Sequence, residues 1–228
     1  MSEPAPLRPL AQTDRTKVRR LADRGSFDRA LAHSIIDEAY LAHVAFVVDG
    51  APRVLPMTYG RDGDVLYLHG AVGNAMLRAS AGAEVCVTIT LLDGLVLARS
   101  AFHHSMNYRS VVLLGRAEKV EDEEEKRRAF DVIVDHVLPG RSQTARPASP
   151  SELRTTLVLR LAIDEGSAKV RTGGAVDDEE DLGLPVWAGV IPLRVAPGAP
   201  EQDALQVADP EQASLRPPEP ARPGAATR

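Results

Sequence analysis

Three aspartate–glycine pairs, each placed between short apolar runs, constrain the fold of this chain more than any other feature. They are Asp49-Gly50, Asp62-Gly63 and Asp93-Gly94. Asp-Gly suits a tight two-residue hairpin turn, because such turns need a positive φ that glycine adopts at no steric cost. Strands joined in this way run antiparallel. The pattern therefore predicts a mainly β fold built from hairpins.

The hydrophobic periodicity places the elements between these turns. Short runs with strand character occur at 43–48, 53–59, 65–69, 84–92, 95–100, 106–120, 153–163 and 169–171. Helical spacing predicts helices over 27–40, from Gly73-Asn74 through Ser80, and over 121–138. Six to eight strands with two or three flanking helices indicate a small antiparallel barrel or sandwich. No glycine-rich dinucleotide fingerprint or P-loop is present, which argues against a wound nucleotide-binding sheet.

The two ends differ from the body in composition. Residues 1–25 form a basic arm that contains Arg15, Lys17, Arg19, Arg20 and Arg24. The arm is either a solvated segment or one that wraps a partner subunit or an anionic cofactor. Residues 26–194 form the expected domain. Residues 195–228 are rich in proline and alanine, which predicts a disordered tail because such a segment buries little apolar surface.

The overall balance of charge and hydropathy excludes several classes of function. The net charge of −5 gives no electrostatic footprint for nucleic acid. No apolar run approaches the roughly 20 residues of a membrane helix. The first residues lack the apolar core of a signal peptide, so a cytoplasmic protein is expected. Histidine and cysteine do not occur at metal-site spacing, and no resident metal ion is expected.

Polar residues cluster at the head of one apolar strand. Asn107, Tyr108, Arg109 and Ser110 precede a Val-Leu run, which is typical of a strand that ends at a polar ligand. Earlier in the chain, a helix that begins at Asn74 leaves backbone N–H groups free for a phosphate. Arg78 lies on the same face of that helix as Asn74, and Arg109 supplies a second guanidinium.

These pieces occur in a recognisable order. The motifs are Leu55–Gly60, Leu66–Gly70, Gly73-Asn74 and Ser105–Val112. In order and spacing they resemble the pyridoxamine 5'-phosphate oxidase-related group, and more closely its flavin-nucleotide-binding branch, which includes the nitroimidazole-resistance proteins. The resemblance covers about residues 14 to 192. It implies an FMN-binding split β-barrel that works as a homodimer, with the flavin in a groove between the subunits.

The resemblance also implies a set of cofactor-binding residues. Met57, Thr58 and Tyr59 would face the flavin ring from a strand edge, and His69 and Gly70 would end the next strand beside it. Asn74 and Arg78 would approach the phosphate. Asn107, Tyr108, Arg109 and Ser110 would reach across from the neighbouring subunit, and Trp187 would close the groove. The lysine that the oxidase itself carries near the phosphate turn is absent.

The function implied is that of an FMN-dependent oxidoreductase acting on a small aromatic, quinone or nitro compound. His69 is the candidate catalytic residue, as a proton donor, because the reference pKa of histidine lies near neutrality. Two alternatives stay open. The protein could be a non-catalytic flavin store, carrier or sensor, or the same barrel could bind haem or a deazaflavin. His69, His103 and His104 are the residues that support haem.

Overall fold

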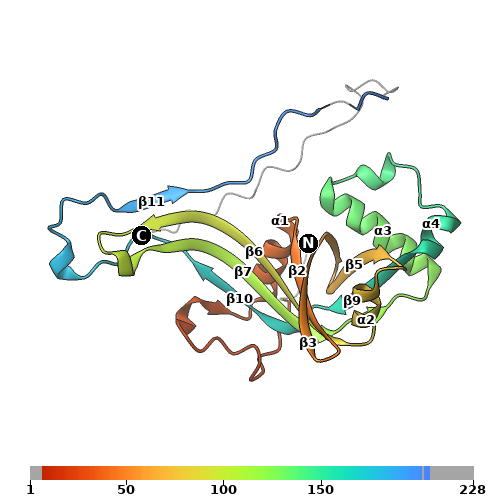
Figure 1. Cartoon of the computed structure of the whole chain (residues 1–228), viewed down its shortest axis with the longest axis horizontal. Helices are drawn as coiled ribbons and strands as arrows, with labels where there is room; N and C mark the ends of the chain where they lie inside the picture. The colour runs from red at the N-terminus through yellow and green to blue at the C-terminus, as the bar shows by residue number, and fades with distance from the viewer. Residues whose placement is uncertain (1–6, 202, 206–228) are drawn as a thin grey trace, which may run out of the picture.

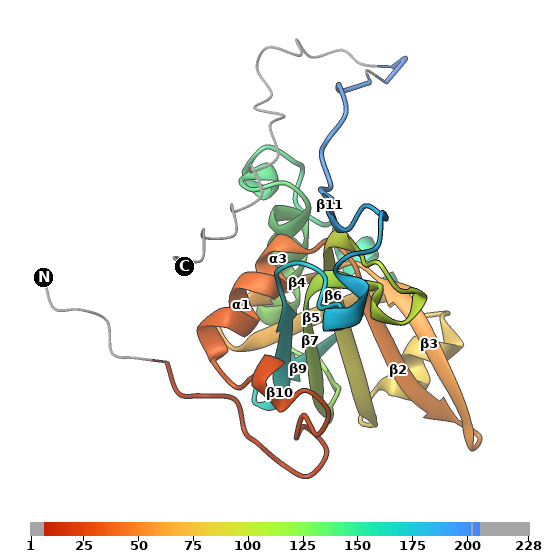
Figure 2. The same cartoon turned by 90° about the vertical axis from the view of Figure 1, so that its left-hand side faces the viewer.

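A computed structural model describes residues 7–201 and 203–205, and these residues build two antiparallel sheets (Figure 1). The larger sheet has the order β1 (Gly25–Ser26), β10 (Glu165–Arg171), β7 (Ser105–Arg116), β6 (Glu84–Leu97), β2 (Ala42–Val48) and β3 (Ala51–Met57), with β11 (Gly189–Pro192) paired to β6. The smaller sheet has the order β4 (Tyr59–Asp62), β5 (Val65–Ala71), β9 (Thr156–Ala162) and β8 (Glu118–Lys119). Figure 2 shows the order of the larger sheet from β10 across to β3.

The mainly β architecture is confirmed, but the number of strands is not. The described residues contain eleven strands rather than six to eight. The additional ones are short: β1 and β8 have two residues each, and β4 and β11 have four. Runs of this length show no usable alternation, and only pairing with strands distant in sequence defines them.

The helices follow the prediction with one addition. α1 (Arg29–Glu38), α2 (Ala75–Ser80) and α3 (Glu123–Val137) lie within the predicted ranges. α4 (Pro150–Thr155) was missed, and its residues overlap a run that was predicted to be entirely strand. Its signal is a capping box, in which the Ser149 side chain accepts from the Glu152 N–H while the Glu152 carboxylate accepts from the Ser149 N–H.

The chain joins the two sheets by crossing between them. It passes from one sheet to the other at Thr58 between β3 and β4, through α2 between β5 and β6, at Ala117 between β7 and β8, and at 163–164 between β9 and β10. The main apolar core takes side chains from both sheets and from α1; it includes Ile35, Ile36, Leu66, Leu68, Val87, Ile89, Val111, Leu113, Leu159 and Leu161. The result is consistent with a split barrel.

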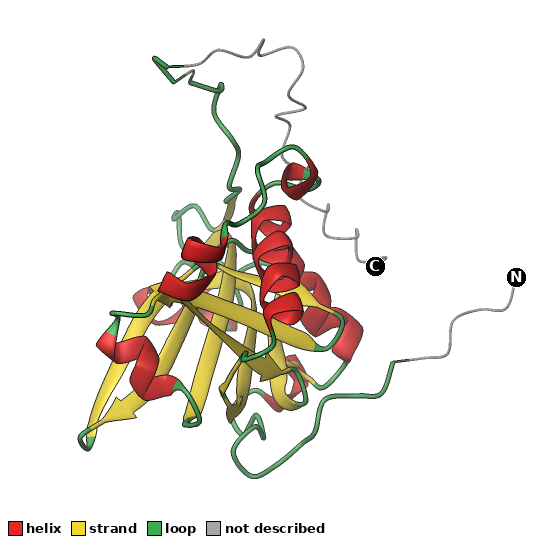
Figure 3. Ribbon diagram, turned by 90° about the vertical axis from the view of Figure 1, so that its right-hand side faces the viewer, coloured by secondary structure: helices red, strands yellow, loops and turns green. Residues whose placement is uncertain are grey.

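α3 packs against the smaller sheet on the side away from this core, as Figure 3 shows. Ala129 and Ile133 are buried there, in a second cluster with Tyr67, Val120 and Val158. The helix approaches β4 closely at Gly60, where an added Cβ would lie 2.8 Å from the backbone nitrogen of Ile133. A glycine is therefore required at this contact.

The second half of β6 and the first half of β7 extend from the body as a long arm, with β11 alongside β6 (Figure 1). The predicted turn at Asp93-Gly94 is wrong. β6 runs through both residues, and the register with β7 shifts between Leu92 and Gly94, which marks a β-bulge. By contrast, Asp49 and Gly50 form the expected hairpin turn, with φ values of 52° and 77°.

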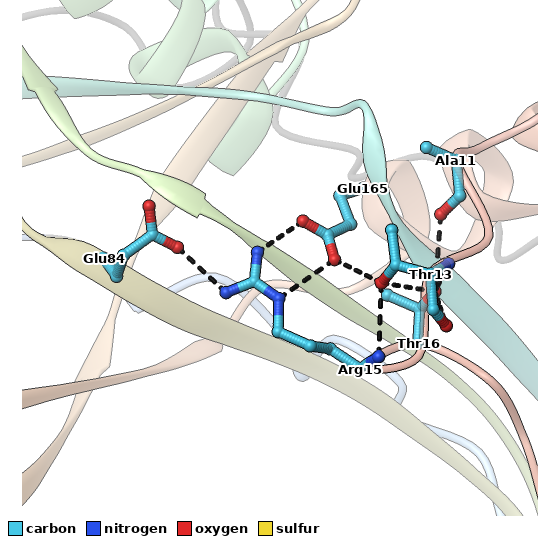
Figure 4. Close-up of polar contacts among 6 residues, drawn as sticks. All are labelled: Ala11, Thr13, Arg15, Thr16, Glu84 and Glu165. Carbon is cyan, nitrogen blue, oxygen red and sulfur yellow. Dashed lines mark hydrogen bonds and ion pairs between the residues drawn. The ribbon is translucent and has the colours of Figure 1, made fainter.

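The N-terminal segment is attached to the body of its own chain. Leu10 is buried in the main core, and Ala11 forms an isolated bridge with Glu165. Figure 4 shows the Arg15 guanidinium between two carboxylates: it donates to Glu165 at 3.1 and 2.5 Å and to Glu84 at 3.1 Å. Within the described residues, the first part of the basic arm is thus tied to β6 and β10.

The predicted tail at 195–228 falls mostly outside the described residues, which omit 202 and 206–228. The described part of it, 195–201 and 203–205, forms no helix or strand. Among the described helices, none combines the length and the apolar character needed to cross a membrane.

Candidate functional site

His69 lies near the end of β5, one residue before Gly70 and shortly before the loop that leads into α2. Gly70 lies against α2, because an added Cβ there would meet Leu77 at 2.9 Å. The strand end, the loop at 72–74 and the start of α2 are therefore brought together, as the motif predicts.

The predicted phosphate residues lie on this loop and helix. The Asn74 side-chain oxygen accepts a hydrogen bond from the Leu77 N–H at 3.1 Å, and so caps α2. Arg78 donates to the Val72 carbonyl at 3.2 Å and is otherwise exposed. The spacing of Asn74 and Arg78 on one short helix is as expected, and the exposed guanidinium remains accessible to a ligand.

The residues predicted to face a flavin ring are divided between surface and core. Tyr59 is fully buried, and its hydroxyl donates to the carbonyls of Ile36 and Ala39 at 2.6 Å. Burial raises the pKa of this phenol far above its usual value. Met57 packs partly against the core, whereas Thr58 is exposed at the crossing between the sheets. Of these three side chains, Thr58 offers its polar group to a ligand.

Arg109 has strong intramolecular partners. Its Nε and Nη2 donate to Asp93 at 2.9 and 2.8 Å, and its Nη1 and Nη2 donate to Glu38. Hydrogen bonds from Glu38 and then Asp93 raise the pKa of the guanidinium. Within one chain, this side chain joins α1, β6 and β7.

The neighbouring residues of the same motif also serve the chain itself. Asn107 is buried; its amide donates to the Gly173 carbonyl at 3.0 Å, and its oxygen accepts from Arg171. Ser110 makes a long contact of 3.4 Å to the Lys169 carbonyl. Tyr108 is half-buried in β7, opposite Arg171 of β10.

Trp187 is 63% exposed and lies two residues before β11, with its ring against Gly189. Figure 1 places β11 at the arm end of the molecule and β5 toward the other end. A single chain therefore does not bring Trp187 beside His69. The predicted site residues form two groups, one on the arm and one at the end of β5.

A pocket of about 390 Å³ opens beside His69. Sequence reasoning missed it, because its walls come from segments far apart in the chain. Its lining consists of His69, Phe130, Asp131, Val134, Ser142, Ala145, Arg146, Pro147, Ala148, Glu152 and Thr156. These residues come from β5, from α3, from η3 (Arg141–Gln143) and the loop after it, and from α4 and the start of β9. A second hollow is lined by the acidic residues 178–180, which disfavour an anionic ligand.

The imidazole of His69 is unusual within this pocket. Its Nδ1 is buried and has no hydrogen-bond partner among the described residues. The ring centroid lies 6.3 Å from that of Phe130. Burial lowers the pKa of His69 below its usual value, which favours the neutral ring at neutral pH and disfavours a role as proton donor. A neutral imidazole without a partner is suited to bind a metal-containing ligand.

Comparison with known proteins identifies the family. The model of the pyridoxamine 5'-phosphate oxidase family matches residues 28–170. The chain belongs to this family. No curated protein matches the chain.

Three solved structures extend the comparison. Flavocytochrome Anf3 from Azotobacter vinelandii is 42% identical, with a TM-score of 0.83 over 88% of this chain and 94% of that one. The FAD and haem binding protein from Mycobacterium smegmatis is 40% identical, with a TM-score of 0.75 over 86% of this chain and 94% of that one. A 5-nitroimidazole antibiotic resistance protein from Bacteroides thetaiotaomicron, described as putative, is 31% identical, with a TM-score of 0.52 over 63% of this chain and 84% of that one.

Proposed function

We propose that this protein is a redox protein that binds a flavin and a haem. The observation that carries the proposal is how far each likeness extends. The flavocytochrome and the FAD and haem binding protein match 88% and 86% of this chain, whereas the nitroimidazole-resistance protein matches 63%. The likeness to the nitroimidazole-resistance protein therefore leaves out a part of this chain that the other two likenesses include. The names of those two proteins include a cytochrome or haem.

The described residues fit a flavin in part. The exposed Thr58 hydroxyl is accessible to a polar ring edge, and the exposed Arg78 guanidinium keeps donors for a phosphate beyond the one that bonds the Val72 carbonyl. The backbone N–H groups of Val72 and Asn74 in the same loop are already bonded to Thr155 and Ala71. We take the flavin to be FAD rather than the FMN expected from the sequence, because the Mycobacterium smegmatis protein is named for FAD. A flavin would supply the hydride or electron transfer, while the protein supplies position and electrostatics.

The described residues also fit a haem. They contain no group of three or more histidine, cysteine, aspartate or glutamate residues that would hold a bare metal ion. A haem does not need such a group, since an imidazole from the protein suffices as an axial ligand. The pocket beside His69 lies within the usual range for small-molecule sites, roughly 300–1,000 Å³.

We further propose that the working form is a homodimer. The support is the separation of the predicted residues into two groups at different ends of one chain. A second copy that laid its arm against the end of β5 would bring Tyr108 and Trp187 toward Thr58 and Arg78. The flavin groove would then be completed by the partner subunit.

An absorption spectrum of the purified protein, with mass spectrometry of the released cofactors, tests the proposal. The expected result is a Soret band together with flavin absorbance, with FAD and haem both released on denaturation. Flavin alone, even after incubation with hemin, would contradict the haem part. It would favour the second candidate, a flavin oxidoreductase for small aromatic, quinone or nitro compounds, which the nitroimidazole-resistance likeness supports. Flavin without turnover of such acceptors would favour a carrier or sensor.

A further inference from the structure

The six histidines of this chain differ in what their ring nitrogens contact. Four of them have a polar partner on at least one ring nitrogen: His33 Nε2 with Asp64 at 3.0 Å, His103 Nε2 with Asp178 at 3.0 Å, His104 Nδ1 with Ser100 at 2.9 Å, and His136 Nε2 with Ala39 at 2.8 Å. His43 is exposed on β2, a strand paired on both sides. His69 is half-buried, and its buried Nδ1 has no hydrogen-bond partner among the described residues. The buried His33 Nε2 likewise lacks a hydrogen bond but has the Asp64 carboxylate as an ion-pair partner, whereas no carboxylate of the described residues pairs with His69.

The surroundings of His69 are those of a ligand pocket rather than of a core. Phe130 and Val134 of α3 supply an apolar wall on one side, and 145–148 form another. Arg146 is the only cation among the lining residues, and it is paired with Glu152 at 2.7 Å on the exposed rim. A flat apolar ring would match the wall of Phe130 and Val134. The lining also holds the carboxylates of Asp131 and Glu152, so the charged edge of such a ligand would lie outside the pocket.

We propose that His69 is the axial ligand of the haem iron and that the pocket formed by β5, α3, η3 and α4 receives the porphyrin edge. The inference rests on the proposed function, since it assigns a residue to the haem. Coordination forms one bond, in which a ring nitrogen donates its lone pair to the iron.

Its place in the pocket distinguishes His69 from the more obvious candidate, His104. His104 has the arrangement expected of a metal ligand, because Nδ1 contacts a backbone carbonyl and Nε2 is left available. It lies, however, on the exposed tip between β6 and β7, next to η2 (Ala101–His103), and does not line the pocket.

Hemin titration of the full chain tests the assignment, with His69→Ala compared against His104→Ala. The expected result for His69→Ala is a fall in hemin affinity beyond the roughly 10–100-fold that loss of an outer-shell partner costs. His104→Ala should bind hemin like the wild type. Added imidazole should restore the Soret band of His69→Gly by occupying the vacated position, and His69→Met should shift the spectrum rather than abolish it.

Control measurements keep the outcomes separate. The thermal midpoints of the haem-free proteins should be alike for the wild type and His69→Ala, which distinguishes a lost ligand from a misfolded chain. A wild-type Soret band in His69→Ala, with unchanged hemin affinity, would overturn this inference and leave the proposed function intact. A wild type that neither contains haem nor binds hemin would overturn the proposed function itself.

Discussion

Replacement of Arg109 by alanine separates two roles for the polar strand motif. The sequence assigns this guanidinium to the cofactor, whereas the structure gives it four hydrogen bonds to Glu38 and Asp93. If the intramolecular role dominates, Arg109→Ala should destabilise the chain even when no flavin is present. If the ligand role dominates, flavin affinity should fall while the stability of the apoprotein is retained.

The expected loss in the free energy of unfolding follows from how deeply the side chains of Arg109, Glu38 and Asp93 are buried. Removing one partner of a fully buried ion pair costs about 3–5 kcal/mol, because a charge is left buried and unpaired. The side chains of Arg109, Glu38 and Asp93 are 16%, 16% and 24% exposed, so solvent screens part of that cost. We expect a loss of about 2–4 kcal/mol. Lys119→Ala is the matched control: its pair with Glu121 at 2.7 Å is 49% and 74% exposed, and about 0–1 kcal/mol is expected.

Urea unfolding of the apoproteins at a fixed protein concentration measures both values, provided that the slope of the transition is unchanged. The variant Arg109→Ala with Glu38→Gln and Asp93→Asn should recover much of the loss, since it removes the two carboxylates that then face each other. An Arg109→Ala apoprotein that unfolds at the wild-type midpoint, with weakened flavin binding, would refute the structural role.

Three further predictions concern packing and pH. Gly60→Ala should destabilise the chain by about 1–3 kcal/mol in urea unfolding, because the new Cβ meets the α3 backbone at 2.8 Å; Gly183→Ala, with nothing within 4 Å of the new Cβ, should change it by less than about 0.5 kcal/mol. Hydrogen bonds, the largest contribution coming from Arg15, lower the pKa of Glu165. Attachment of the N-terminal segment to β10 is therefore complete above the usual carboxyl range and weakens as the pH falls through it. Limited proteolysis should show faster cleavage of this segment at acid pH in the wild type, and already at neutral pH in Arg15→Ala. Burial lowers the pKa of His136, so its contribution to stability is present above about pH 6.5 and is lost as pH falls below; His136→Gln should flatten the pH dependence of the thermal midpoint, and an unchanged profile would contradict this.

An Asp-Gly pair predicts the structure correctly where the turn depends only on neighbouring residues. Asp49-Gly50 predicts a hairpin and forms one, since both residues adopt the positive φ that such a turn needs. Asp93-Gly94 has the same residues and forms a bulge instead. Here the Asp93 carboxylate is held by Arg109, and a Cβ at Gly94 would lie 3.0 Å from Val190 of β11. Both partners are distant in sequence, so no local pattern distinguishes the two cases.

The site residues show the same division. The motif correctly places Asn74 at the start of α2 and His69 near the end of β5, because both positions follow from strand and helix boundaries. It gives no warning that Tyr59 is committed to two backbone carbonyls in the core. The pocket was missed for a related reason. Phe130 packs partly against the second core cluster, yet it also lines the pocket with His69, and only the packing of distant segments shows this.

The arm formed by β6 and β7 leaves several large apolar side chains exposed in a single chain. Leu92, Met106, Phe102 and Trp187 are 42%, 51%, 88% and 63% exposed, and all lie on the arm or its connecting loops. Several large apolar side chains left in water on one extended part of the chain are typical of an interaction surface rather than of a free monomer. Burial of such surface stabilises by about 25 cal/mol per Å². A second copy of the chain is the partner that would cover these side chains and also bring Trp187 toward the flavin site, and this joint gain is the strongest physical argument for the proposed homodimer.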